Sequence, residues 1–278
     1  MDKGNFFRTE DGAVLYYEDR GAGIPIVFVN GFAGTTKSFE KNVEGLAETY
    51  RVITFDLRGY GRSSKVLTGN HMRGHAADIH EVINHLGLEN AILMGWSSGG
   101  SAVTCYCREY GNEHLAAVGL IDCPLFPFSG DSWNAHRAGG YKVDNWWGTT
   151  KQWIAEPEAF IDHYIQTINP TATEKEKAWI KEGVESLPVW IGVAVHSDYC
   201  QFDGTEGLPY IQVPVLIFSS DSPGLDVSMS EYYRSLLKVP SRLLVYKEAT
   251  HMLFYTQSER FNGDVNSFIQ DVLNHSLG

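Results

Sequence analysis

A serine flanked by glycines follows directly on a short apolar run. The run is Ala91–Met94, and the segment Gly95–Gly100 places Ser97 in the pattern G-x-S-x-G. After a buried strand, this pattern is typical of a nucleophile elbow, a sharp strand-to-helix turn that exposes the serine hydroxyl. Glycines on both sides leave the room that such a strained turn needs, because they carry no Cβ. The sequence therefore predicts that Ser97 is a nucleophile.

A nucleophilic serine needs a base that takes its proton. His251 is the best candidate among the ten histidines, because it follows the strand-like segment Leu243–Tyr246 late in the chain. Four other histidines lie on or near one predicted helix at residues 71–86, and their spacing does not fit the zinc-binding pattern H-E-x-x-H. We expect His251 to be the base, and we expect neither a metal site nor a cofactor.

Acyl transfer also needs donors for the negative charge that develops on the substrate oxygen. The apolar segment Ile26–Val29 runs into Asn30, Gly31 and Phe32, which is where an acyl-transfer enzyme with such an elbow places its second donor. We expect the backbone N–H groups of Phe32 and Ser98 to form this oxyanion hole. Two convergent donors stabilise the developing charge strongly in a water-poor site.

Four motifs follow one another in a recognisable order. They are Asn30-Gly31-Phe32, the loop Asp56–Ser64 with the pattern D-x-R-G-x-G-x-S, the elbow at Gly95–Gly100, and His251. With this order the chain resembles the α/β-hydrolase superfamily from about residue 6 to residue 273, in particular small carboxylesterases and cofactor-free haloperoxidase-like serine hydrolases. Asn30 departs from the histidine that these families usually carry before the glycine. The resemblance implies a catalytic triad of serine, histidine and an acid.

The position of the acid in these families points to one part of the chain. They usually carry it just after the strand that here corresponds to Pro214–Phe218, but the matching position holds Pro223. A proline cannot orient an imidazole. Asp221 and Asp226 flank this position, and a small bulge in the loop would bring Asp221 into place.

Asp122 is a second possible source of the acid. It follows the strand-like segment Val118–Ile121, and some branches of the superfamily take their acid from the end of that strand. A buried carboxylate there is well placed to orient His251 in its base tautomer. A helix or turn cap is the alternative interpretation of Asp122. We favour Asp122 as the acid, followed by Asp221 and then Asp226.

The elements that must position these residues are short strands that alternate with helices. This alternation predicts an α/β fold with a mainly parallel central sheet and helices on both faces, and it breaks between Cys123 and Leu208. We therefore expect an α/β-hydrolase core from residues 1–122 and 209–278, with a helical cap, or lid, inserted at residues 123–208. Thr173 and Glu176 predict a capping box at the start of one lid helix.

The predicted lid is rich in aromatic side chains, and it contains six of the seven tryptophans. Most of them should pack the lid on the core, but some must cover the serine. Such a lid favours an apolar acyl chain or an aromatic ester. The residues predicted to line the substrate pocket are Trp96, Phe126, Trp146, Trp147 and Trp153.

Composition excludes several classes of partner. The formal net charge is −12 with no basic patch, which argues against nucleic acid and anionic membranes. No apolar run reaches membrane-spanning length, and the first residues lack the apolar core of a signal peptide. The four cysteines form no C-x-x-C pair, so we expect reduced thiols in a cytoplasmic enzyme.

Together these features predict a serine hydrolase. It would cleave a small-molecule carboxylic ester, lactone or related acyl compound with an apolar group, through an acyl-enzyme on Ser97. One alternative is a C–C bond hydrolase or a cofactor-free dioxygenase of the same fold, although such dioxygenases carry a histidine where Ser98 stands. The other alternative is a non-catalytic small-molecule receptor that retains the triad.

Overall fold

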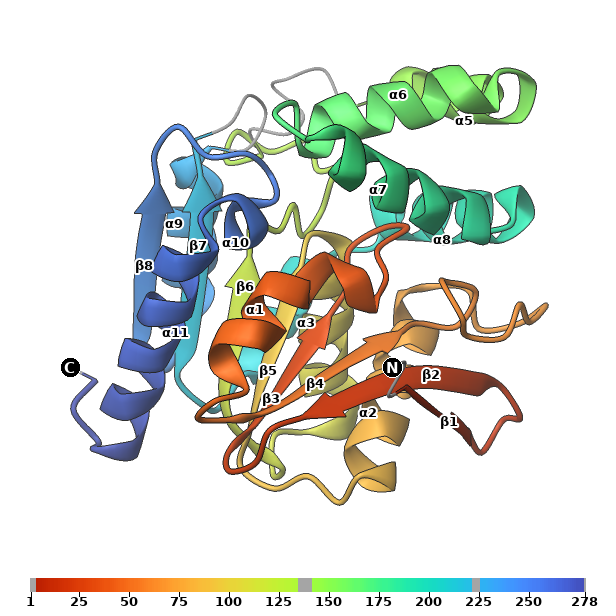
Figure 1. Ribbon diagram of the computed structural model, residues 1–278. Coiled ribbons are helices and arrows are strands. Elements are labelled where there is room, and N and C mark those ends of the chain that lie inside the picture. Colours follow the sequence, from red (N-terminus) through yellow and green to blue (C-terminus); the bar gives the residue numbers. More distant parts are fainter. Residues whose placement is uncertain (1–3, 135–141, 222–225, 278) are drawn as a thin grey trace.

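Eight strands form one sheet at the centre of the molecule (Figure 1). The computed structural model describes residues 4–134, 142–221 and 226–277, so Pro223 lies outside the described residues. The sheet order is β1-β2-β4-β3-β5-β6-β7-β8. The strands are β1 (Asn5–Arg8), β2 (Val14–Arg20), β3 (Pro25–Val29), β4 (Arg51–Asp56), β5 (Ala91–Trp96), β6 (Leu115–Ile121), β7 (Val215–Ser220) and β8 (Ser241–Tyr246).

The sheet is mainly parallel, as predicted. Strand β2 pairs antiparallel with β1 and β4, and the other pairs are parallel. Every residue of β3 and β5 is buried, which is the continuous apolar character of strands covered on both faces. The helices of the core are α1 (Glu40–Leu46), α2 (Met72–His85), α3 (Ser98–Tyr110), α9 (Val227–Leu236), α10 (Leu253–Thr256) and α11 (Ser258–Leu273).

These helices cover the two faces of the sheet. Helices α1 and α11 pack together on one face, and α2, α3 and α9 lie on the other (Figure 1). Helix α2 buries Met72, Ala76, Ile79 and Ile83, whose three- and four-residue spacing places them on one side of a helix. The predicted α/β fold with helices on both faces is confirmed.

Between β6 and β7 the described residues form four further α-helices. They are α5 (Val143–Ala155), α6 (Pro157–Ile168), α7 (Glu174–Ser186) and α8 (Val189–Gln201), and the 3₁₀ helix η2 (Gly204–Tyr210) follows them. Helix α7 begins with the predicted capping box, because the Glu176 N–H donates to the Thr173 hydroxyl and the Thr173 N–H donates to the Glu176 carboxylate. The helices lie beyond the ends toward which the parallel strands point (Figure 1). In α/β folds, ligands bind at this edge.

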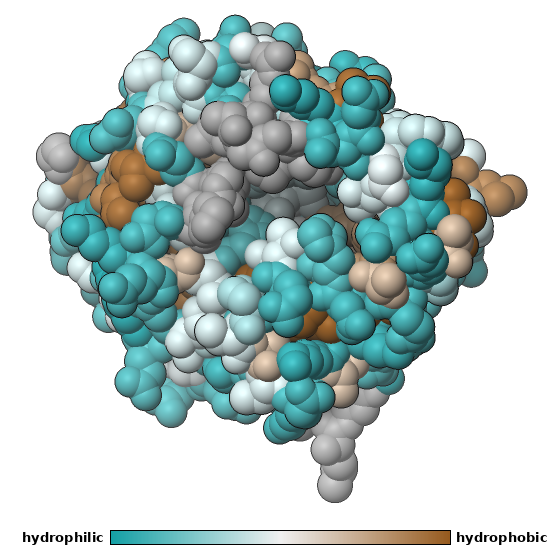
Figure 2. Space-filling model, turned by 90° about the horizontal axis from the view of Figure 1, so that it is seen from above, coloured by the Kyte–Doolittle hydropathy of each residue, from teal (hydrophilic) through white to brown (hydrophobic). Residues whose placement is uncertain are grey.

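The outer surface of this end of the molecule is mainly hydrophilic. Seen from above, hydrophobic side chains occur there only in small separate groups (Figure 2). Four aromatic side chains of the inserted helices, Trp153, Phe160, Trp179 and Tyr199, are buried, so much of the aromatic surface turns inward. Within the described part of the chain, no helix is long and apolar enough to cross a membrane.

A close approach between the first turn of α3 and the end of β3 determines how the start of α3 is placed. If Gly99 carried a Cβ, that atom would lie 2.6 Å from the carbonyl oxygens of Val29 and Asn30. Real Cβ atoms do not approach backbone oxygens so closely. The absence of a side chain at residue 99 therefore lets the first turn of α3 lie against the end of β3.

We expect Gly99→Ala to lower the free energy of unfolding by about 1–3 kcal/mol, because the added methyl group forces two packed backbone segments apart. Gly263→Ala is the matched control, since residue 263 is an exposed position of α11 where a Cβ meets no atom within 4 Å. That substitution should raise the free energy of unfolding by about 0.5–1 kcal/mol. Urea denaturation measures both values, and a Gly99→Ala protein as stable as the wild type would contradict the close approach.

Candidate active site

Ser97 lies in a strained turn between β5 and α3. Its backbone has φ 53° and ψ −125°, a conformation that costs a non-glycine residue on the order of 1–3 kcal/mol. The turn is tied to the neighbouring strand, because the Ser97 N–H donates to the carbonyl of Ile121 at the end of β6 (3.0 Å). This is the geometry of a nucleophile elbow, in which the hydroxyl projects from the apex of the turn.

Asp122 follows β6 and is anchored to β7. Its N–H donates to the carbonyl of Phe218 at 2.8 Å. Its carboxylate accepts hydrogen bonds from the Ser220 N–H (2.7 Å) and the Ser220 hydroxyl (2.9 Å). The side chain is buried, with Asp122 only 3% exposed. A buried carboxylate with several donors has one defined orientation, because each lost hydrogen bond would leave charge unpaired in the interior.

His251 lies against this carboxylate. Its Nδ1 is 2.8 Å from Oδ2 of Asp122, and the residue is buried in the loop between β8 and α10. The carboxylate can only accept, so Nδ1 carries the proton in this hydrogen bond. In the neutral imidazole, Nε2 is then the unprotonated nitrogen. The arrangement therefore gives His251 the tautomer that a general base of a serine enzyme requires.

The other two acid candidates lie elsewhere. Asp226 is exposed and caps α9, where its carboxylate accepts from the Ser228 N–H at 2.6 Å. This hydrogen bonding lowers the pKa of Asp226. Asp221 is also exposed. Among the three carboxylates considered from the sequence, the structure brings Asp122 to His251.

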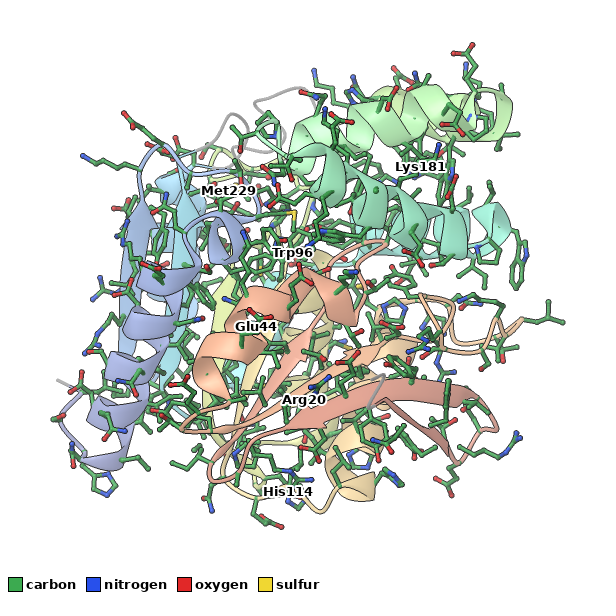
Figure 3. The ribbon with its side chains drawn as sticks, viewed as in Figure 1. Arg20, Glu44, Trp96, His114, Lys181 and Met229 are labelled. Carbon is green, nitrogen blue, oxygen red and sulfur yellow. The ribbon has the colours of Figure 1, made fainter. Side chains whose placement is uncertain are left out.

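Trp96 supports the histidine loop from below. Its indole N–H donates to the carbonyl of His251 at 3.0 Å, and the two rings lie 5.4 Å apart. The side chain is almost fully buried at the level where the sheet meets the inserted helices (Figure 3). This contact gives Trp96 a part in positioning His251, whereas its predicted part in the pocket wall stays a prediction.

The loop after β3 directly faces the elbow. A Cβ on Gly31 would lie 2.9 Å from the Cβ of Ser97, so only glycine lets this loop approach the elbow so closely. Phe32 is the next residue of the loop. Ser98 is the buried first residue of α3, and the first N–H groups of a helix have no partner within the helix. These positions fit the two expected oxyanion donors, Phe32 and Ser98.

Asn30 stands where the resembled families carry histidine. Its side chain is fully buried, and its amide donates to the carbonyl of Phe55 in β4 at 3.1 Å. The bond ties the end of β3 to β4. Asn30 therefore anchors the base of the loop that carries Phe32.

The side chain of Phe32 is surrounded by aromatic rings from three inserted helices. Its ring centroid lies 5.7 Å from that of Trp153 on α5, 6.2 Å from that of Tyr164 on α6 and 5.1 Å from that of His196 on α8. Tyr60 from the loop after β4 completes the group. The sequence analysis did not single out Tyr164 or His196. The spacing of Phe160 and Tyr164 on one side of α6 was the available signal.

The predicted pocket tryptophans have different surroundings. Trp153 is buried and stacks on Phe160 at 4.7 Å. Trp146 and Phe126 are half-buried, but Trp147 is 51% exposed. Neighbouring residues of a helix are about 100° apart around its axis, so Trp146 and Trp147 cannot both face the core. The structure brings Trp153 to Phe32 and does not bring Trp147 there.

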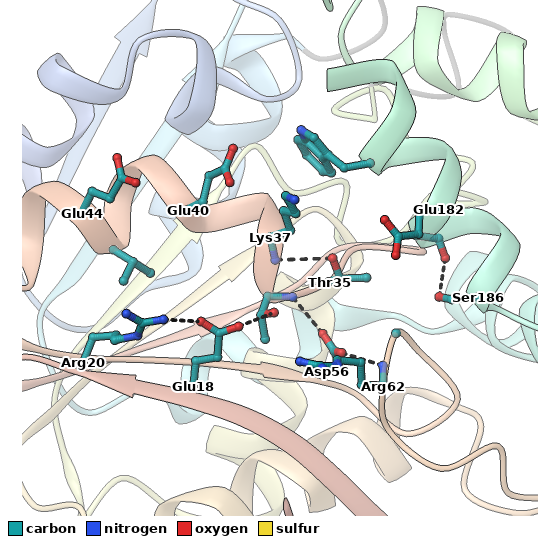
Figure 4. A pocket seen from close by; sticks show the side chains of 15 residues that line it. Glu18, Arg20, Thr35, Lys37, Glu40, Glu44, Asp56, Arg62, Glu182 and Ser186 are labelled. Carbon is teal, nitrogen blue, oxygen red and sulfur yellow. Dashed lines mark hydrogen bonds and ion pairs between the residues drawn. The ribbon is translucent and has the colours of Figure 1, made fainter. Parts of the chain in front are cut away.

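A cavity of about 570 Å³ lies outside the aromatic group around Phe32, between the 3₁₀ helix η1 (Thr36–Phe39), α1 and α7 (Figure 4). Charged side chains of both signs line it, among them Glu18, Arg20, Lys37 and Glu182. None of Ser97, Asp122 and His251 borders it. Across the described ranges, no group of three or more histidine, cysteine or carboxylate side chains could bind a metal ion.

Asp56 connects this cavity to the loop after β3. The N–H groups of Thr36 and Arg62 donate to its carboxylate at 2.8 and 2.7 Å (Figure 4). Burial raises the pKa of Asp56 to about 6. The cavity wall therefore helps to support the chain between Phe32 and α1, and neither Ser97 nor Phe32 lines it.

Comparison with known proteins agrees with the α/β fold. A family model described as the alpha/beta hydrolase fold matches residues 24–160. The chain is 27% identical to a non-heme haloperoxidase of Rhodococcus erythropolis, over 95% of this chain and 99% of the relative. It is also 27% identical to a bifunctional esterase/perhydrolase of Acinetobacter calcoaceticus, again over 95% and 99%.

A solved structure has nearly the same fold. It is an esterase from Exiguobacterium antarcticum, which is 25% identical, covers 96% of this chain and 99% of its own, and has a TM-score of 0.87. The predicted resemblance to the α/β-hydrolase superfamily is confirmed: the chain has the α/β-hydrolase fold, and its similarity to esterases and haloperoxidases supports an enzyme of the hydrolase type.

Proposed function

We propose that this enzyme hydrolyses carboxylic esters or lactones that carry an apolar group, through an acyl-enzyme on Ser97. The observation that supports this most strongly is the 2.8 Å hydrogen bond between Nδ1 of His251 and the buried Asp122 carboxylate. It leaves Nε2 as the base, and Ser97 occupies a strained elbow whose N–H is bonded to Ile121, the residue before Asp122. The names of an esterase/perhydrolase relative and an esterase of the same fold support the same reaction class.

The proposed reaction has two halves. Nε2 of His251 takes the Ser97 proton while the serine oxygen attacks the substrate carbonyl, and the imidazolium then protonates the departing alkoxide. A water molecule, deprotonated by the same nitrogen, attacks the acyl-enzyme. The bond between the acyl carbon and the Ser97 oxygen then breaks, the imidazolium returns the proton to that oxygen, and the acid is released. In both halves the backbone N–H groups of Phe32 and Ser98 stabilise the oxyanion. Asp122 stabilises the imidazolium and maintains its orientation.

The aromatic group around Phe32 supports an apolar substrate. Rings from α5, α6 and α8 surround the side chain of Phe32, and aromatic walls bind acyl chains or aromatic groups better than sugars or phosphates. We propose that residues 123–208 act as a lid that carries this specificity, on a core of residues 1–122 and 209–278. The partner is then a small apolar ester.

Ser97→Ala should lower kcat/KM for p-nitrophenyl acetate by at least about 10⁴-fold, because the nucleophile is lost while the fold is retained. Ser101→Ala, one turn further along α3, is the matched control. The Ser101 hydroxyl is buried and has no hydrogen-bond partner among the described residues. Its removal breaks no hydrogen bond, so activity should stay within about twofold of wild type.

Initial rates and circular dichroism of the three proteins test this proposal. Retention of more than a few per cent of activity in Ser97→Ala would exclude Ser97 as the nucleophile. A wild-type protein that binds an ester tightly without turnover would instead favour the receptor alternative.

Trp153→Ala should reduce the preference for long acyl chains over acetate. Removal of one buried aromatic contact changes chain binding by about 1–3 kcal/mol, and acetate turnover reports any general loss. Trp147→Ala is the control, because Trp147 lies on the same helix, α5, but is half exposed. A series of p-nitrophenyl esters of increasing chain length gives kcat/KM for each variant. If kcat/KM of Trp153→Ala falls equally at every chain length relative to wild type, Trp153 only stabilises the helices.

A further inference from the structure

The end of β7 lies beside the point where β6 stops. Ile121 of β6 pairs with Phe218 of β7, and the Asp122 N–H continues this ladder by donating to the Phe218 carbonyl. In a parallel pair with this register, the next bond would run from the Ser220 N–H to the backbone carbonyl of Asp122. Asp122 has φ 50°, so the chain leaves the strand direction there. The Ser220 N–H donates to Oδ1 of the Asp122 side chain instead, at 2.7 Å.

The Ser220 hydroxyl bonds to the other oxygen of the same carboxylate. It donates to Oδ2 at 2.9 Å, because a carboxylate only accepts. Nδ1 of His251 lies 2.8 Å from that same oxygen. Ser220 is fully buried. The hydroxyl and the imidazole therefore share one oxygen of Asp122 in the interior of the protein.

Two donors on one oxygen affect each other. A hydrogen bond to a carboxylate stabilises its negative charge, and it does so most when no cation neutralises that charge. The Ser220 hydroxyl therefore bonds more strongly while the His251 imidazole is neutral than after the imidazolium has formed. The hydroxyl favours the neutral imidazole, which is the form that can accept a proton from Ser97.

The other titratable groups around Asp122 do not supply a competing charge. Cys123, the next residue, and Tyr233 on α9 both interact with the Asp122 charge, and burial raises the pKa of each. Both are therefore neutral near pH 7. Three charged side chains of the flanking loops are exposed, where water screens them; they are Asp221, Lys247 and Glu248.

We propose that Ser220 is a positioning residue that acts on His251 through Asp122. Its N–H and hydroxyl hold the two carboxylate oxygens so that Oδ2 faces His251, and its hydroxyl limits the negative charge that Oδ2 offers to the imidazolium. His251 consequently remains an unprotonated base at a lower pH than it would beside Asp122 alone. The inference rests on the proposed function, because it assigns Ser220 a part in ester hydrolysis.

Ser220→Ala removes the hydroxyl and keeps the N–H. We expect the acidic limb of the pH profile of kcat/KM for p-nitrophenyl acetate to move upward by at least about half a pH unit, because Oδ2 then stabilises the imidazolium more strongly. The plateau at higher pH should stay within about tenfold of wild type, since the bond between His251 and Asp122 remains. Ser220→Thr keeps a hydroxyl and should return the limb to within about 0.2 pH unit of wild type.

Ser219→Ala is the matched control. Ser219 is also buried in β7, but its hydroxyl donates to the backbone carbonyl of Ser220 at 3.2 Å. Successive residues of a strand point to opposite faces, and this bond does not involve the carboxylate. The acidic limb should therefore stay within about 0.2 pH unit of wild type. A shift as large as that of Ser220→Ala would show a general loosening of β7 and would overturn the specific role of Ser220.

Two other kinetic results would overturn it. One is an acidic limb in Ser220→Ala that is unchanged or lies at lower pH, and the other is a limb in Ser220→Thr displaced as far as in Ser220→Ala. Circular dichroism checks that each variant is folded. If Ser220→Ala does not fold, Ser220→Cys gives the same comparison, because a thiol is only a weak donor.

A wild type that hydrolyses no ester would contradict the proposed function and still leave this inference testable. The titration of His251 is then followed directly by NMR of its ring in the wild type and in Ser220→Ala. A midpoint at higher pH in the variant supports the role of Ser220. A midpoint that is equal or lower excludes it.

Discussion

The hydrogen bond between Asp122 and His251 is the interaction on which the rest of the site depends. The two residues are 129 positions apart in the chain, and they meet because β6, β7 and β8 are neighbours in the sheet. Asp122 follows β6, its carboxylate is bonded by Ser220 of β7, and His251 follows β8. A buried carboxylate is costly unless it is fully hydrogen-bonded, so any change in the register of these strands would disrupt the orientation of the base.

Backbone strain is concentrated around the same edge of the sheet. Six described non-glycine residues have positive φ, and four of them, Ala33, Ser97, Asp122 and Glu248, lie in the loops that follow β3, β5, β6 and β8. Each such residue costs on the order of 1–3 kcal/mol. The hydrogen bonds from Ser97 to Ile121, from Asp122 to Phe218 and from Tyr164 to Phe32 offset this cost. Strain maintained in this way is typical of residues that are held ready for chemistry.

The sequence was sufficient to predict the fold and to identify Ser97 and His251 as candidates. Continuous apolar strands, helical periodicity and the G-x-S-x-G pattern are local signals, and local signals can be read from one chain. The choice among Asp122, Asp221 and Asp226 was not local. It depends on which of the three carboxylates the strand order brings to His251, and that one is Asp122. Asp226 instead caps the start of α9.

The inserted helices show where sequence reasoning loses detail. Trp146 and Trp147 look equivalent in the sequence, but adjacent helix residues point about 100° apart, so they cannot both point at the protein core. Trp147 is the exposed one. Tyr164 belongs to no motif, and its hydrogen bond joins it to residue 32, which lies 132 positions away. Contacts of that kind require the packed structure.

The most direct test of the account is to determine which nitrogen of His251 carries the proton. Long-range ¹H–¹⁵N NMR of the protein at neutral pH distinguishes the two tautomers, with Asp122→Asn for comparison and Asp226→Asn as the control. The account predicts a protonated Nδ1 and a bare Nε2 in the wild type and in Asp226→Asn. It predicts loss of this preference in Asp122→Asn, because an amide can also donate to Nδ1. A wild-type His251 protonated at Nε2, or a tautomer unchanged in Asp122→Asn, would contradict it.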